Sequence, residues 1–357
     1  MKKKLFLGSK NKNYPEVYFF GNLTRIFLSS LIIISFFFIS PILIDFKNNT
    51  SITSLDVRNN SKNDLKKLLD KRDIESDMVI NQKFLFEDIL SFDERPADSV
   101  RLSASTIEEL FKSTNYNLED VRKNKLVKPI SLTLLPKEIK KIENTKKRKD
   151  FFIQIILPLV IKENNNIRLN RIKLFNILNK SKNTKAEKVW LNTKFKHYGV
   201  ASKDLSTLKI RMDEVPVSMA IAQAAKETGW GTSRFAQEGN ALFGQWTYSG
   251  DGIKPSDADN DTKHKVMKFR ILQASVKAYH RNLNTHSSYK GFRSARAELR
   301  LEKKKLDSMI LSEHLDKYAE TGKDYVRVLQ QIITQNNLTD FDDAKLLPSS
   351  INLDSLI

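Results

Sequence analysis

The chain has 357 residues, 40% hydrophobic and 29% charged, which allows one sizeable core or two domains with appendages. Its formal net charge of +19 favours polyanionic partners such as nucleic acid, anionic lipid or an anionic cell wall. The absence of cysteine excludes disulfides, thiolate catalysis and cysteine-ligated metals.

The segment Ile26–Ile44 carries no charge over 19 residues. At about 1.5 Å per residue it is long enough for a bilayer core of roughly 30 Å. Six basic residues and one acid precede it, so we expect residues 1–25 to be a basic cytoplasmic N-terminus. No small-residue cleavage pattern follows, which favours an uncleaved transmembrane signal anchor over a cleaved signal peptide.

Residues 45–128 are polar and show no long periodic pattern, which predicts a stem that is partly disordered. Short helices are expected within it at residues 64–70 and 105–112. Nothing in this part of the chain forms a catalytic constellation.

Residues 130–200 form a helical region that we expect to pack on the domain after it. Residues 150–164 are apolar but too short to span a membrane, which predicts a buried helix that kinks or ends near Pro158. A second helix is expected over 168–178, and one or two more over 185–212.

The most informative stretch is 217–246, VSMAIAQAAKETGWGTSRFAQEGNALFGQW. Its first ten residues contain strong helix formers, and Gly229 is suited to a left-handed helix stop. Glu227 is therefore expected in the last helical turn, where exposed carbonyls and the neighbouring Trp230 would disfavour a negative charge and raise its pKa. A carboxyl group that keeps its proton near neutral pH suits a glycosidase acid.

After this stretch the composition changes. Residues 248–271 contain glycines and acidic loops, which predict a β-hairpin or a small three-stranded lobe. Helical spacing then recurs to the end of a domain that we place at residues 201–340, followed by a frayed tail at 341–357. The helices expected there are 274–286, 294–303, 306–319 and 324–336.

Several chemistries find no support. The five histidines form no HExxH pair, so we expect neither a metal site nor a cofactor. No serine-hydrolase elbow, P-loop or dinucleotide fingerprint occurs. The basic residues are spread along the chain, and nucleic-acid binding would rest on charge alone, so we expect no nucleic-acid partner.

Two segments, AQAAKETGWGTSRF (222–235) and EGNALFGQW (238–246), resemble the motif of the bacterial endo-β-N-acetylglucosaminidase family, which comprises peptidoglycan hydrolases. Within that family the chain is most similar to the Bax-like subgroup. The resemblance extends through YHRNLNTH (279–286), YAETGKDYV (318–326) and the upstream region 135–160, and covers roughly residues 130–340.

The resemblance implies a lysozyme-like α+β fold, mainly helical with a small β-hairpin lobe and a glycan cleft between the lobes. It implies cleavage of the β-1,4 bond after N-acetylglucosamine in peptidoglycan. By this resemblance, the family's catalytic glutamate corresponds to Glu227 and its tyrosine to Tyr318. The family's second carboxylate lies in the β lobe, where this chain has Asp257, Asp259 and Asp261. The substrate-binding residues implied are Trp230, Phe243, Gln245, Trp246 and Tyr279.

The second chemical step stays open at this stage. Either an aspartate such as Asp257 or Asp259 activates water, or the substrate's acetamide attacks with Tyr318 orienting it. A lytic transglycosylase or muramidase would use the same Glu227, and a non-catalytic wall-binding scaffold is the remaining alternative. The expected partners are peptidoglycan glycan strands, and the membrane through residues 26–44.

These predictions together describe a monomeric single-pass protein of the bacterial inner (cytoplasmic) membrane. Its catalytic domain would lie on the periplasmic, cell-wall side. The net charge of +19 suits that location, because peptidoglycan stems and lipid head groups are anionic.

Overall fold

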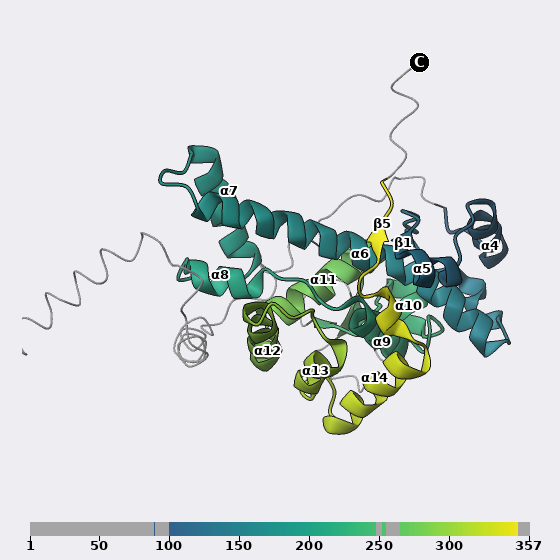
Figure 1. The fold of residues 1–357 in the computed structure, drawn as a ribbon. Coiled ribbons are helices and arrows are strands. Elements are labelled where there is room, and N and C mark those ends of the chain that lie inside the picture. The colour runs from purple at the N-terminus through teal and green to yellow at the C-terminus, as the bar shows by residue number, and fades with distance from the viewer. Residues whose placement is uncertain (1–88, 90–99, 248–251, 255–264, 349–357) are drawn as a thin grey trace, which may run out of the picture. The chain divides into compact units, whose positions relative to one another are not determined.

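The computed structural model describes residue 89 and residues 100–247, 252–254 and 265–348 (Figure 1). Within these residues the fold is mainly helical α+β, as predicted. The α-helices are α4 (Ala104–Ser113), α5 (Leu118–Asn124), α6 (Thr145–Leu178), α7 (Lys185–His197), α8 (Leu205–Arg211), α9 (Val217–Thr228), α10 (Arg234–Gly239), α11 (Leu272–Thr285), α12 (Lys290–Leu301), α13 (Ser308–Ser312) and α14 (Lys323–Gln335). The 3-10 helices are η1 (Lys137–Lys141), η2 (Ser287–Tyr289), η3 (Glu313–Leu315) and η4 (Leu338–Phe341).

Two small sheets complete the described fold. Strands β2 (Trp246–Thr247), β4 (Lys265–Met267) and β3 (Gly252–Ile253) pair antiparallel in that order, which confirms the predicted small β lobe. Strands β1 (Leu126–Val127) and β5 (Lys345–Leu346) pair in parallel. The second sheet was not predicted, since residues 341–357 were expected to be a frayed tail, whereas η4 and β5 order this segment up to residue 348.

Helix α9 lies at the centre of the main hydrophobic core. Every residue from Val217 to Ala225 is buried, and α6, α14 and η4 pack around the helix. Its alanines present little side-chain volume, so neighbouring helices approach closely. A helix that is buried all round needs no polar face, which explains its run of small apolar residues.

Helix α6 continues through Pro158 for 34 residues, so the predicted end of a helix near Pro158 is wrong, and the helices expected over 150–164 and 168–178 are one helix. Proline removes the N–H that would bond the carbonyl four residues earlier, here that of Gln154. The hydroxyl of Tyr116 donates to that carbonyl at 3.1 Å and replaces the missing bond. The first half of α6 is buried against α9 and α11, whereas its second half packs with α7 and α8 in a separate cluster (Figure 1).

The helices predicted at 105–112, 274–286, 294–303 and 324–336 correspond to α4, α11, α12 and α14. The single helix predicted over 306–319 is wrong, because the chain forms α13 and then η3 there. The backbone leaves helical geometry at His314, with φ −96° and ψ 15°.

The predicted membrane anchor, Ile26–Ile44, lies outside the described residues, as does the helix expected at 64–70. Among the helices of the described ranges, none has both the length and the hydropathy needed to cross a bilayer.

A buried ion-pair cluster holds the segment that leads into α9. The Asp213 side chain is 3% exposed and accepts from Arg300 Nη2 at 3.0 Å and Nε at 3.2 Å. Arg296 is fully buried, lies 3.9 Å from Asp213 Oδ2, and donates to Asn284 Oδ1 at 2.7 Å and to the Glu214 carbonyl at 2.9 Å. The cluster therefore joins α11 and α12 to the residues just before α9.

Replacing Asp213 with alanine should lower the free energy of unfolding by about 3–5 kcal/mol, because the buried Arg296 guanidinium loses its charge partner. Burial alone would raise the pKa of Asp213, but Arg296, Arg171 and Arg300 together hold it below its ordinary value. Its stabilisation should therefore be complete above the ordinary aspartate pKa of about 3.9 and disappear as pH falls through the lower folded pKa. Urea unfolding across this pH range measures both effects.

The matched control is Glu109→Ala, which removes an exposed carboxylate from α4 and should change stability by less than about 0.5 kcal/mol. Equal stability of wild type and Asp213→Ala would contradict the proposed role of this cluster.

Candidate active site

The end of α9 places Glu227 as the sequence predicts. Gly229 adopts left-handed geometry with φ 56°, and its N–H bonds the Ala225 carbonyl, which ends the helix. Trp230 is also left-handed, with φ 61°. Glu227 therefore lies in the last helical turn, beside a sharp reversal of the chain.

The Glu227 carboxylate is mostly buried, and its two oxygens have different surroundings. Oε1 accepts a hydrogen bond of 2.9 Å from the Tyr325 hydroxyl. Oε2 faces Gly244, where an added Cβ would lie only 3.0 Å away. Gly244 has φ +61°, so the residue allows both the left-handed backbone and the close approach of the 243–246 segment to Glu227.

A chain of hydrogen bonds reaches Glu227 from the core. Tyr279 donates to Gln223 Oε1 at 2.5 Å, and Gln223 Nε2 donates to the Tyr325 oxygen at 3.1 Å. Tyr325 then uses its own proton for Glu227. Gln223 is four residues before Glu227, so both lie on one face of α9. This series of hydrogen bonds fixes the Tyr325 hydroxyl as a donor to the Glu227 carboxylate.

Stacked rings surround these bonds. The ring of Tyr318 lies parallel to that of Tyr325, with centroids 5.5 Å apart, and Tyr289 lies 5.9 Å from Tyr318. Phe243 stacks on Tyr279 at 3.9 Å. We refer to Tyr279, Tyr289, Tyr318 and Tyr325 as the tyrosine cluster. Its members come from α11, η2, the turn before α14, and α14 itself.

Burial raises the pKa of Glu227, while the Tyr325 hydrogen bond and the charge of Lys226 oppose that rise. Among the described residues, no second carboxylate contributes to this shift. Burial likewise raises the pKa of Tyr289 to about 12, with a further contribution from the Glu227 charge, so Tyr289 keeps its proton near neutral pH. The site thus combines a carboxyl group whose pKa burial raises with a neutral tyrosine hydroxyl.

The predicted substrate residues of the 243–246 segment lie at different depths. Phe243 is fully buried, as is Tyr279, so both rings form the inner wall of the site. Gln245 is 9% exposed, and neither its Oε1 nor its Nε2 has a hydrogen-bond partner among the described residues. Trp246 on β2 is 47% exposed and presents a large aromatic surface to solvent.

Trp230 is partly buried and packs edge-on against Phe152 of α6, with centroids 5.9 Å apart. The Lys149 ammonium lies 4.9 Å from the centre of the Trp230 indole. The sequence predicts that Trp230 helps to desolvate Glu227, whereas the aromatic side chain that hydrogen-bonds the Glu227 carboxylate is Tyr325.

The remaining predicted residues have separate outcomes. The Tyr318 hydroxyl donates to the Phe243 carbonyl at 2.7 Å, beside the residues that contact Glu227. Asp257, Asp259 and Asp261 lie outside the described residues. Within the described part of the chain, no group of three or more histidine, cysteine or acidic side chains is arranged to hold a metal ion.

Tyr325, Gln223 and Tyr289 are residues of the site that the sequence did not predict. Tyr325 fits the apolar stripe of its helix, which concealed the role of its hydroxyl. Gln223 gave the clearer signal, because it is the one polar residue between Met219 and Ala225, one turn before Glu227. Tyr289 lies three residues after the segment 279–286, and no sequence motif includes it, so no signal marked it as a residue of the site.

Comparison with known proteins agrees with this geometry. The family model described as mannosyl-glycoprotein endo-beta-N-acetylglucosaminidase matches residues 205–338, which include Glu227, Gly244 and the tyrosine cluster. The chain is 30% identical to Protein bax of Escherichia coli (strain K12) over 205 residues, which cover 56% of this chain and 73% of that protein. No solved structure matches the chain significantly.

The match to this relative spans 73% of its length, and the family model matches the part of the chain that contains Glu227. The chain therefore belongs to the Bax-like group of the endo-β-N-acetylglucosaminidase family and is a glycoside hydrolase that acts on peptidoglycan.

Proposed function

We propose that this enzyme cleaves the β-1,4 bond after N-acetylglucosamine in peptidoglycan, with Glu227 as the general acid and with the lobes arranged as in lysozyme. The observation that carries the proposal is the buried Glu227 carboxyl, whose pKa is raised by desolvation. A glycosidase acid must hold its proton until the leaving oxygen takes it, and burial is the usual means.

The hydrogen bonds suggest which oxygen of Glu227 carries the proton. Oε1 already accepts from Tyr325, and this bond persists when the carboxyl group is neutral. The proton then resides on Oε2, which faces Gly244. A glycosidic oxygen placed near Oε2 would receive it directly, while Tyr325 holds the carboxyl group in orientation.

The second step has two candidate routes in this site. In one, Asp257 or Asp259 activates a water molecule for attack on the sugar. In the other, the substrate's acetamide oxygen attacks, and Tyr318 orients the acetamide. Tyr318 donates its proton to the Phe243 carbonyl, so its lone pairs are suited to accept from the acetamide N–H.

Trp246 is the best placed of the predicted residues for contact with a sugar ring. Its indole is 47% exposed on β2, two residues after Gly244. Phe243 and Tyr279 are buried, so we propose that they support the wall of the site rather than contact the glycan directly. Gln245 could supply polar contacts, because neither end of its amide has a partner within the described part of the chain.

We further propose that residues 26–44 anchor the enzyme in the bacterial inner membrane, with the catalytic domain on the periplasmic side. The uncharged segment and the basic residues before it support this topology. Replacing residues 26–44 with a cleavable secretion signal should release the protein into the soluble periplasmic fraction. Equal membrane retention of both forms after alkaline washing would contradict the anchor.

Digestion of purified sacculi tests the catalytic proposal. Wild type should release fragments that end in reducing N-acetylglucosamine, as mass spectrometry of borohydride-reduced products can determine. Glu227→Gln should lower the rate by about 10³-fold, because the amide cannot donate an acidic proton. It should still bind sacculi in a pull-down assay.

The control is Glu238→Gln, which changes an exposed carboxylate on α10 and should keep wild-type activity. Anhydromuramic ends would indicate a lytic transglycosylase and reducing muramic ends a muramidase, and either result would overturn the proposed bond specificity. No digestion by wild type, with sacculus binding retained, would favour a wall-binding scaffold.

A further inference from the structure

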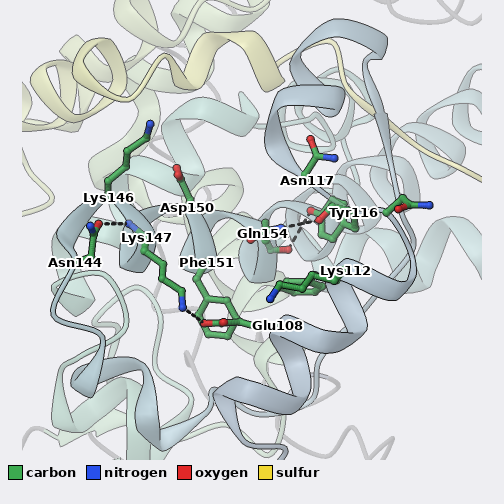
Figure 2. Close-up of a pocket in the computed structure, with 12 residues that line it drawn as sticks. Glu108, Lys112, Tyr116, Asn117, Asn144, Lys146, Lys147, Asp150, Phe151 and Gln154 are labelled. Atoms are coloured by element: carbon green, nitrogen blue, oxygen red, sulfur yellow. Dashed lines mark hydrogen bonds and ion pairs between the residues drawn. The ribbon is translucent and has the colours of Figure 1, made fainter.

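A polar groove runs along the first turns of α6, apart from the contacts of Glu227. It consists of two cavities of about 590 and 900 Å³. Both are lined by Asn117, Lys146, Asp150 and Gln154, so they adjoin along α6, and we name them together the α6 groove. Figure 2 shows the first cavity, between α4 and α6, with Lys146 and Asp150 along one edge.

The charges of the α6 groove are unevenly paired. Lys147 pairs with Glu108 at 2.9 Å. Lys112 and Lys146 are exposed and make no ion pair, and the Asp150 carboxylate makes none either. These statements apply to the part of the chain that the structure describes. The groove therefore presents unneutralised ammonium groups around one unneutralised carboxylate.

The uncharged lining is rich in amides and poor in accessible rings. The amide side chains are Asn115, Asn117, Asn144, Gln154, Gln335, Asn336 and Asn337. The rings of Phe111, Tyr116 and Phe151 are only 2–4% exposed, so they form the floor and offer no face for a sugar to stack on. Asn117 and Asn144 already cap α5 and α6, and Gln154 and Asn336 already donate to backbone carbonyls. Among the described residues, this leaves Asn115, Gln335 and Asn337 to pair with peptide groups at both their donor and acceptor ends. This lining suits a peptide better than a glycan.

One end of the groove approaches the segment that carries Glu227. Lys149 lines the second cavity, and its ammonium lies over the Trp230 ring. Trp230 follows Glu227 by three residues. A ligand in the groove would therefore extend away from the turn at the end of α9, while a sugar chain occupied the site beside Glu227.

We propose that the α6 groove binds the peptide stem of peptidoglycan, recognised as a short peptide with several carboxylates and a free amine. This inference rests on the proposed function. Lys112, Lys146 and Lys149 contact the stem carboxylates, and Asp150 contacts the free amine. The α4, α5 and α6 residues of the groove precede the family match at 205–338, which gives them no role.

The test compares glycan strands that carry their stems with strands from which an amidase has removed them. The double variant Lys112→Gln/Lys146→Gln should lose about fivefold in kcat/KM on stem-bearing strands, because two surface charge contacts disappear. It should match wild type on stem-free strands. Asp150→Asn should lose the preference for stems with a free amine over stems whose amine is acetylated.

The matched control is Lys185→Gln/Lys188→Gln, which removes the same charge from exposed positions on α7 and should leave both rates unchanged. If Lys112→Gln/Lys146→Gln loses the same factor in kcat/KM on both substrates, or loses nothing on either, the proposal that the α6 groove binds the stem is overturned.

If wild type cleaves neither substrate, the proposed function is wrong. Titration of an isolated stem peptide into the full-length protein, followed by NMR, then tests separately whether the α6 groove binds the peptide. Binding that weakens in the Lys112/Lys146 variant and persists in the α7 control would support it. The peptide-binding proposal would be overturned if the stem peptide does not bind, or if anionic lipid vesicles bind and the peptide does not.

Discussion

The hydrogen bond from Tyr325 to Glu227 is the contact on which the site depends. Without a donor, a carboxyl group buried to this degree would bear an unpaired oxygen, at a cost of about 1–3 kcal/mol. Tyr325 supplies the donor without supplying a charge, so the carboxyl group is oriented but not forced to ionise. Because Gln223 donates to the Tyr325 oxygen, the hydroxyl proton is directed at Glu227. The balance between burial and this one neutral bond is what suits Glu227 to proton donation.

The rest of the fold holds the two partners of that bond in place. Glu227 is fixed by α9, which is buried among α6, α14 and η4. The N-terminal end of α9 is held in turn, because Ser218 donates through its N–H and its hydroxyl to Asp342, each at 2.8 Å. Segments far apart in the sequence therefore converge on one short helix. A glycosidase needs such support, because small displacements of the acid from the leaving oxygen reduce the rate strongly.

The parts of the fold that follow from local sequence could be predicted, and those that depend on distant residues could not. The end of α9 was predictable, because Gly229 encodes its own left-handed stop. The continuation of α6 through Pro158 was not, because the compensating donor, Tyr116, is 38 residues from the carbonyl it bonds. Tyr325 is 98 residues from Glu227, and its place in an apolar stripe indicated a core residue. Strand β5 is two residues long and pairs with β1, more than 200 positions earlier, so no local sequence pattern predicts it.

Direct titration of the Glu227 carboxyl group tests the central claim, that burial raises the pKa of this group while the neutral Tyr325 donor orients it and opposes part of that rise. Selective ¹³C labelling of glutamate, with Glu227→Gln to assign the signal, gives the pKa by NMR. We expect a wild-type pKa above the ordinary glutamate value of about 4.3. We expect a still higher pKa in Tyr325→Phe, because the hydrogen bond that this variant loses favours the ionised form of Glu227. A wild-type pKa at or below the ordinary value, or a lower pKa in Tyr325→Phe, would contradict the account.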